Sequence, residues 1–168
     1  ISAKLRMLTP SGTCSWLSKM GKLAITGISQ KSGLPLADMQ KELAFIASKF
    51  VDHVCLCWPP DFKDDVSVWY LCGHTDGLEL ETDSLTKAGS LQMAILNGCS
   101  TTSLAQQLQA HGVPHIVYWQ EHVPDHIAAL FGSTFIQKCL DCFALMDAFG
   151  CACEAIRSTG SCPILLSP

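Results

Sequence analysis

The sequence predicts an α/β fold, in which a mainly parallel β-sheet is covered by helices on both faces. Two observations lead to this prediction. From about residue 22 onward, short runs of strand-forming residues alternate with stretches of helical periodicity. The strand-like runs are also apolar on both faces, which is typical of parallel strands buried between two helical layers. In such a fold, ligands and reactive groups gather at the carboxyl ends of the strands.

Individual elements can be placed from chain breakers and apolar spacing. The strand that begins at residue 53 stops at Pro59 and Pro60, and the strand that begins at residue 66 stops at Gly73. Strands are expected over residues 22–29, 53–58, 66–72, 91–96, 114–119 and 163–167. Helices are expected over residues 37–50, from the hydroxyl residues 100–103 to about 112, from 124 onward, and through 143–157.

Length and composition favour one domain with one substantial core. The 168 residues are 48% hydrophobic and only 15% charged. We assign residues 22–168 to this domain and residues 1–21 to an N-terminal extension. Because the chain begins at Ile rather than Met, we expect it to be part of a longer protein that carries regulatory domains.

Charge and hydropathy narrow the class of partner. The formal net charge is −4, and the 11 Lys and Arg residues are scattered singly, so no basic stripe favours nucleic acid or an anionic membrane. No apolar run approaches the roughly 20 residues that span a bilayer. We therefore expect a protein or peptide partner, and neither a nucleic-acid nor a membrane surface.

Ten cysteines are many for a chain of this length. Most fall inside the predicted strands and helices, which argues against a secreted disulfide scaffold and predicts reduced, buried thiols. Reduced thiols are typical of intracellular proteins, so we expect a cytoplasmic or, alternatively, a nuclear protein. Four residues could be considered as zinc ligands, namely His122, His126, Cys139 and Cys142. Their spacing is not that of a known zinc finger or zinc ribbon. We expect no metal and no cofactor, and a metal or redox module is the weakest functional alternative.

A histidine and a cysteine each follow a predicted strand directly. His74 comes just past one strand in VWYLCGHTDG, and Cys99 just past the next in AILNGCST. If those strands are neighbours, the two side chains start about 5 Å apart, one strand spacing. A nearby imidazole and the start of a helix after Cys99 would lower the pKa of the thiol and make it a nucleophile. The alternative is that Cys99 is one of many structural cysteines.

The order of short motifs around these residues resembles a known family. An apolar strand with Gly-His is followed by Leu-Asn-Gly-Cys-Ser, by Gly-Val-Pro-His-Ile-Val and by Val-Pro-Asp-His-Ile-Ala. This series is similar to the CHAT domain, a caspase-like cysteine peptidase relative in a group that includes separase. The resemblance runs from about Lys22 to Ser167. It implies a caspase-like three-layer sandwich and peptide-bond hydrolysis through a thioester acyl-enzyme.

The resemblance also implies roles for individual residues. Cys99 would attack the scissile carbonyl, and His74 would handle the proton of the leaving group. The backbone N–H groups of Cys99 and Thr75 would form the oxyanion hole. Relatives have Gly where this chain has Thr75, so we expect its side chain to crowd the substrate or to resist a backbone conformation that Gly tolerates.

Asp125 is the candidate for substrate selection. It matches an acidic position that in separase-like relatives faces the pocket for the residue before the cleaved bond, where it would favour Arg or Lys. The alternative is that Asp125 only begins the helix after Pro124. Together with the short connection between His74 and Cys99, the departure at Thr75 keeps open a second function, that of an inactive pseudo-peptidase used as a protein-interaction scaffold.

Overall fold

The computed structural model describes residues 21–28, 37–50, 52–63, 65–141 and 143–168, so most of the expected extension over residues 1–21 lies outside the described residues. Six strands form one sheet in the order β2-β1-β3-β4-β5-β6. They are β1 (Lys22–Ile28), β2 (His53–Cys55), β3 (Val66–Gly73), β4 (Met93–Gly98), β5 (His115–Tyr118) and β6 (Ile164–Leu166). Neighbouring strands are parallel except for the antiparallel pair β5 and β6.

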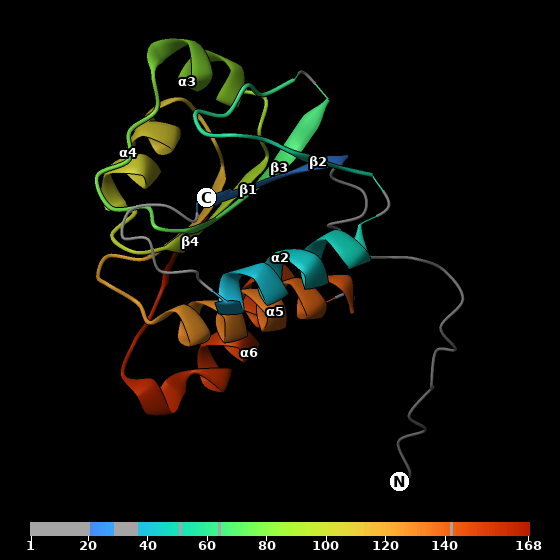
Figure 1. The fold of residues 1–168 in the computed structure, drawn as a ribbon, viewed down its shortest axis with the longest axis vertical. Coiled ribbons are helices and arrows are strands. Elements are labelled where there is room, and N and C mark those ends of the chain that lie inside the picture. Colours follow the sequence, from blue (N-terminus) through green and yellow to red (C-terminus); the bar gives the residue numbers. More distant parts are fainter. Residues whose placement is uncertain (1–20, 29–36, 51, 64, 142) are drawn as a thin grey trace, which may run out of the picture.

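Helices cover both faces of the sheet. One layer holds α2 (Ala37–Lys49), α5 (Asp125–Leu140) and α6 (Leu145–Ala155), and the other holds α3 (Thr82–Ala88) and α4 (Thr102–Ala110), as Figure 1 shows. A 3-10 turn, Arg157–Thr159, follows α6. The predicted α/β sandwich with a mainly parallel sheet is therefore confirmed.

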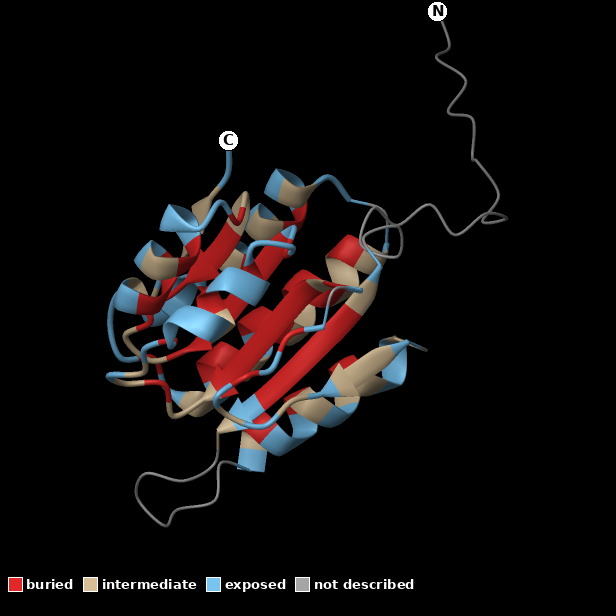
Figure 2. Cartoon of the chain, turned by 90° about the horizontal axis from the view of Figure 1, so that it is seen from above, coloured by how far each residue is buried: buried red, intermediate tan, exposed pale blue. Residues whose placement is uncertain are grey.

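Strand β3 shows how the apolar sequence serves both layers. Because successive side chains of a strand point to opposite faces, Tyr70 and Cys72 pack with the α2, α5 and α6 layer, while Trp69 and Leu71 pack with the α3 and α4 layer. All four side chains are buried, and the central strands are buried along most of their length (Figure 2).

Three details differ from the sequence-based expectation. Strand β4 begins at Met93 rather than at Leu91, because the N–H of Leu91 instead donates to Ala88 O at 2.9 Å in the turn after α3. Helix α3, which was not expected, is short and buries few side chains. The predicted burial of most cysteines is wrong at Cys55 and Cys57, which are exposed, because β2 is an edge strand and ends at Cys55 instead of continuing to residue 58.

The ends of β3 and β4 determine where the site lies. Gly73 and Gly98 are partners in the parallel register, so His74 and Cys99 leave the sheet from adjacent positions at its carboxyl edge. Gly73 has a φ of +104°, and a Cβ there would overlap the carbonyl oxygen of Ile28. The N–H of His74 donates to that same oxygen at 2.9 Å. The path of the chain into His74 thus requires glycine.

We expect Gly73→Ala to lower the free energy of unfolding by at least about 2 kcal/mol, because it adds a steric clash to an unfavourable φ. Gly112→Ala is the matched control: its φ is +87°, but a Cβ there meets nothing within 4 Å. The free energy of unfolding of that control should fall by only about 1 kcal/mol, the cost of a positive φ for alanine. Urea unfolding measures both, and equal losses would show that the contact with Ile28 has no energetic weight.

Candidate active site

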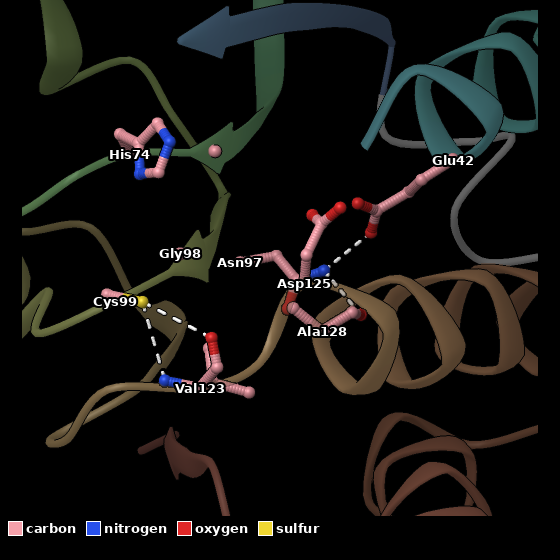
Figure 3. Close-up of a pocket in the computed structure, with 9 residues that line it drawn as sticks. Glu42, His74, Asn97, Gly98, Cys99, Val123, Asp125 and Ala128 are labelled. Atoms are coloured by element: carbon pink, nitrogen blue, oxygen red, sulfur yellow. Dashed lines mark hydrogen bonds between the residues drawn. The ribbon is translucent and has the colours of Figure 1, made fainter. Parts of the chain in front are cut away.

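A pocket opens at the carboxyl edge of the sheet, between the ends of β3 and β4 and the starts of α2 and α5 (Figure 3). Its volume is about 110 Å³. It is lined by Glu42, Gly73, His74, Asn97, Gly98, Cys99, Val123, Asp125 and Ala128. Three of the predicted site side chains, those of His74, Cys99 and Asp125, therefore meet in one pocket.

The imidazole of His74 is held in the pocket wall with one nitrogen unsatisfied. Its Nε2 atom is buried and has no hydrogen-bond partner among the described residues. Buried polar atoms without a partner are rare, and each calls for an explanation. An imidazole nitrogen in this position can take up a proton from a group that enters the pocket.

Cys99 is half-buried and engaged with the opposite wall. Its thiol donates to Val123 O at 3.3 Å, and the N–H of Val123 donates to Sγ at 3.4 Å. Burial raises the pKa of the Cys99 thiol, the negative charges of Asp76 and Asp125 raise it further, and the backbone contact at Val123 lowers it. The net direction is upward, so the predicted lowering of this pKa is wrong for the arrangement seen here.

The pKa of Cys99 is not lowered because neither His74 nor the start of α4 contacts the sulfur. No hydrogen bond joins Cys99 to His74 in this arrangement, and their side chains lie on separate walls of the pocket (Figure 3). Helix α4 begins three residues later, at Thr102, after Ser100 has turned away with a φ of +51°. The thiol is therefore protonated at neutral pH in this arrangement.

The backbone of Thr75 is not strained, in contrast to one of the two expectations, and Thr75 is not among the described residues that line the pocket. It is not among the described residues with positive φ, and only 1% of its surface is exposed. Its hydroxyl donates to Cys99 O at 2.6 Å, and its side chain fills the space beside Gly98, which has no Cβ. Thr75 thus ties the loop after β3 to the loop after β4.

Asp125 connects two helices and also faces the pocket. It is the first residue of α5, where a carboxylate is favoured, and its Oδ2 accepts from the N–H of Asp38 at 3.2 Å in the first turn of α2. Both sequence-based interpretations therefore describe part of its environment: Asp125 begins a helix, and it lines the pocket.

The sequence analysis missed a buried polar network behind the pocket. Glu42 of α2 is 3% exposed, and its Oε1 accepts from the hydroxyl of Tyr70 and from Asn97 Nδ2, the latter at 2.5 Å. Asn97 Nδ2 also contacts Ala128 O at 2.8 Å, and Asn97 Oδ1 accepts from Trp119 Nε1 at 2.9 Å. One signal was visible: Glu42 lies three residues after Met39, on the face of α2 expected to be apolar.

Glu42 is a buried carboxyl group with no positively charged partner among the described residues. Burial raises its pKa to about 7, and the negative charge of Asp125 raises it too, against the lowering effect of the hydrogen bonds from Tyr70 and Asn97. No Lys or Arg among the described residues lies within 4.0 Å of Glu42 or Asp125. A proton on Glu42 is what balances its burial near neutral pH.

This burial makes stability depend on pH. Because the pKa of Glu42 is raised in the folded state, from 4.5 to about 7, folding favours the protonated form, and stability is lost as pH rises from about 5 through 7. At 1.36 kcal/mol per pKa unit the loss is about 3 kcal/mol. Glu42→Gln should flatten this slope in urea unfolding, whereas the exposed control Glu154→Gln should keep it. Parallel slopes in all three proteins would contradict the assignment.

The other residues considered for binding or metal do not gather. His122 is exposed and pairs with Asp76 at 3.6 Å, Cys139 is buried, and Cys142 lies outside the described residues. In the part of the chain that the structure describes, no three His, Cys, Asp or Glu side chains are grouped to hold a metal ion. Nor does any described helix combine the length and apolar character that crossing a membrane requires.

Comparison with known proteins gives a similarity of fold. No family model matches the sequence, and no curated protein matches it. Among solved structures, two crystal structures of the Saccharomyces cerevisiae separase–securin complex match 88% of this chain. The structure at 3.0 Å resolution gives a TM-score of 0.66 at 12% identity, and the structure at 2.6 Å gives 0.61 at 13%.

The chain spans 12% of the length of the chain it matches in those structures. At a sequence identity of 12% to 13%, the similarity between this chain and the matched structures is one of fold. The chain therefore shares the fold of the part of separase, a caspase-like cysteine peptidase, that it matches, whereas the narrower resemblance to the CHAT domain stays a prediction.

Proposed function

We propose that this chain is a cysteine endopeptidase unit that cleaves peptide bonds with Cys99 as nucleophile and His74 as its proton acceptor. The observation that carries the proposal is the meeting of a thiol and a buried, unpaired imidazole nitrogen in one pocket, at the aligned ends of two parallel strands. The fold shared with separase supports it.

Catalysis would begin with a change at Cys99. Substrate would displace the contact between the thiol and Val123, and the proton of Sγ would pass to His74 as sulfur bonds to the scissile carbonyl carbon. Breakdown of the tetrahedral adduct breaks the C–N bond, and the amine leaves with the proton from His74. Water then hydrolyses the thioester and releases the carboxylic acid.

The developing oxyanion would be stabilised by backbone N–H groups. Those of Cys99 and Thr75 are the candidates, and the hydrogen bond from the Thr75 hydroxyl to Cys99 O supports their fixed relative position. The neighbouring N–H groups already donate hydrogen bonds within the protein. That of His74, before Thr75, donates to Ile28 O, and that of Ser100, after Cys99, donates to Glu121 O.

The pocket favours a basic residue before the cleaved bond. Asp125 lines it with a carboxylate, and no Lys or Arg is among the described residues of its lining. The substrate would be an intracellular protein or peptide. The matched structures hold separase with the protein securin, and we propose by analogy that regulatory domains or a partner protein control this chain.

A pseudo-peptidase scaffold is the second candidate. It is favoured by the raised pKa of the Cys99 thiol and by the missing hydrogen bond between Cys99 and His74. In a scaffold of this kind the pocket would bind a peptide without cleaving it.

A peptidyl-arginine chloromethylketone should alkylate Cys99 in preference to the exposed Cys55, Cys57 and Cys162, because Cys99 lies in the pocket that also holds His74 and Asp125. His74→Ala should slow this labelling at least about 100-fold by removing the proton acceptor. Cys57→Ala is the control and should leave the rate at Cys99 unchanged. Peptide mapping by mass spectrometry measures each site, and labelling spread evenly over the exposed thiols would contradict the proposal.

Asp125→Asn should lower kcat/KM for substrates with Arg or Lys before the cleaved bond by at least tenfold, since an uncompensated cation would remain in the pocket. Substrates with norleucine there should change little. Asn keeps an oxygen that can accept from the N–H of Asp38, so the fold should persist. Asp83→Asn, on the surface of α3, is the matched control. Equal losses for basic and neutral substrates would remove Asp125 from specificity.

A further inference from the structure

Two free thiols meet where the chain turns back from α6 toward β6. Cys153 lies in the last turn of α6, and Cys162 lies two residues before β6 begins. Their side chains are close enough to share a hydrogen bond. Neither residue lines the pocket that holds Cys99, so the proposed catalytic reaction does not explain why these two thiols are brought together.

The backbone of the turn between α6 and β6 returns the chain to the helix. The 3-10 turn Arg157–Thr159 follows α6, and Gly160 after it has a φ of +73°. The hydroxyl of Thr159 donates to Ile156 O at 2.7 Å, and the N–H of Ser161 donates to that hydroxyl at 3.2 Å. Ile156 is itself fully buried. The turn is therefore fixed by hydrogen bonds and by the core, and the meeting of the two thiols follows from it.

The two thiols differ in their access to solvent. Cys162 is exposed, whereas Cys153 is half-buried and packs against the core beneath α2, α5 and α6. Burial, and after it the neighbouring Cys162, raise the pKa of Cys153 to about 11. A reagent that arrives from solvent therefore reacts first with Cys162, and Cys153 is placed to react with a group that Cys162 already holds.

We propose that Cys153 and Cys162 form a modification site, a dithiol that small disulfides of the glutathione class oxidise to an intramolecular disulfide bond. An accessible cysteine with a second, resolving cysteine beside it is the arrangement in which this oxidation is selective and reversible. The inference does not rest on the proposed peptidase function, because neither cysteine belongs to the pocket of Cys99.

The oxidation consists of two thiol–disulfide exchanges. The sulfur of Cys162, as the thiolate, bonds to one sulfur of glutathione disulfide, whose S–S bond breaks and releases a first glutathione thiolate. Cys153 then loses its proton to solvent, and its sulfur displaces the second glutathione thiolate from Cys162. Both glutathione thiolates take up protons. The two cysteines together lose two electrons and two protons, and one glutathione disulfide is reduced to two glutathione molecules.

The disulfide bond would fix one wall of a second pocket. Residues 159–162 line a polar pocket of about 470 Å³ together with residues 119–122 of the loop after β5. The next residue of that loop, Val123, contacts the thiol of Cys99 through its N–H and its carbonyl oxygen. The oxidation state of the pair would therefore control how freely the turn before β6 moves against the loop that holds Cys99.

The test is peptide mapping by mass spectrometry without reduction, after the chain has been exposed to glutathione disulfide. The peptides that carry Cys153 and Cys162 should be joined, with no glutathione left on either. In Cys153→Ser, glutathione should stay on Cys162 at least about tenfold longer than in the wild type, because no second thiol lies in position to displace it.

Cys151→Ser is the matched control, because Cys151 is half-buried on the same helix, two residues before Cys153. This variant should form the disulfide as fast as the wild type. Cys162→Ser changes an exposed side chain and should keep the fold, but should leave Cys153 reduced. A lasting glutathione adduct on Cys162 of the wild type, or equal oxidation of Cys153 in Cys162→Ser, overturns the inference.

Urea unfolding supplies a second measurement. The disulfide bond restricts the unfolded chain, so the oxidised wild type should unfold at a higher urea concentration than the same protein after treatment with dithiothreitol. Cys162→Ser, treated in the same two ways, should show no such shift. A lower midpoint for the oxidised wild type would show that the native turn does not accommodate the bond and would contradict the inference. Neither measurement requires peptidase activity, so the two proposals fail separately.

Discussion

The parallel register of β3 and β4 is the constraint on which the site depends. Because Gly73 and Gly98 are partners, the residues that follow them, His74 and Cys99, leave the sheet side by side. A slip of β3 by one residue would turn Tyr70 into the opposite layer and break its hydrogen bond with Glu42, which helps to hold this register. Thr75 then ties the two loops together through Cys99 O. The pocket is thus a consequence of how the core is packed.

The electrostatics of the pocket explain its resting state. Burial raises the pKa of the Cys99 thiol and the pKa of Glu42, and nearby negative charge raises both further. In this arrangement the pocket therefore holds a neutral thiol and, below about pH 7, a neutral carboxyl group. A cationic side chain would change both conditions at once, because it supplies the positive charge that the described lining lacks. Activation by substrate fits this arrangement better than a permanent thiolate does.

The sequence predicted the mainly parallel sheet, the chain order of its strands and the position of His74 and Cys99 just past two of them, because alternating apolar runs and their breakers report burial and chain reversal directly. It did not predict Glu42, because the polar partner that makes a buried acid tolerable lies on another element, at Asn97. The pKa of Cys99 was misjudged for a related reason. Its direction depends on whether the sulfur faces Val123 or His74, and spacing along a strand does not encode side-chain orientation.

The most direct test of the whole account is a crystal structure of the chain after reaction with a peptidyl-arginine chloromethylketone. The account predicts a covalent bond to Cys99 Sγ, and the inhibitor oxygen within hydrogen-bond distance of the N–H groups of Thr75 and Cys99. The imidazole of His74 should contact the reacting centre, and the guanidinium group should lie beside Asp125. A reagent attached to another cysteine, or an arginine side chain turned away from Asp125, would contradict it.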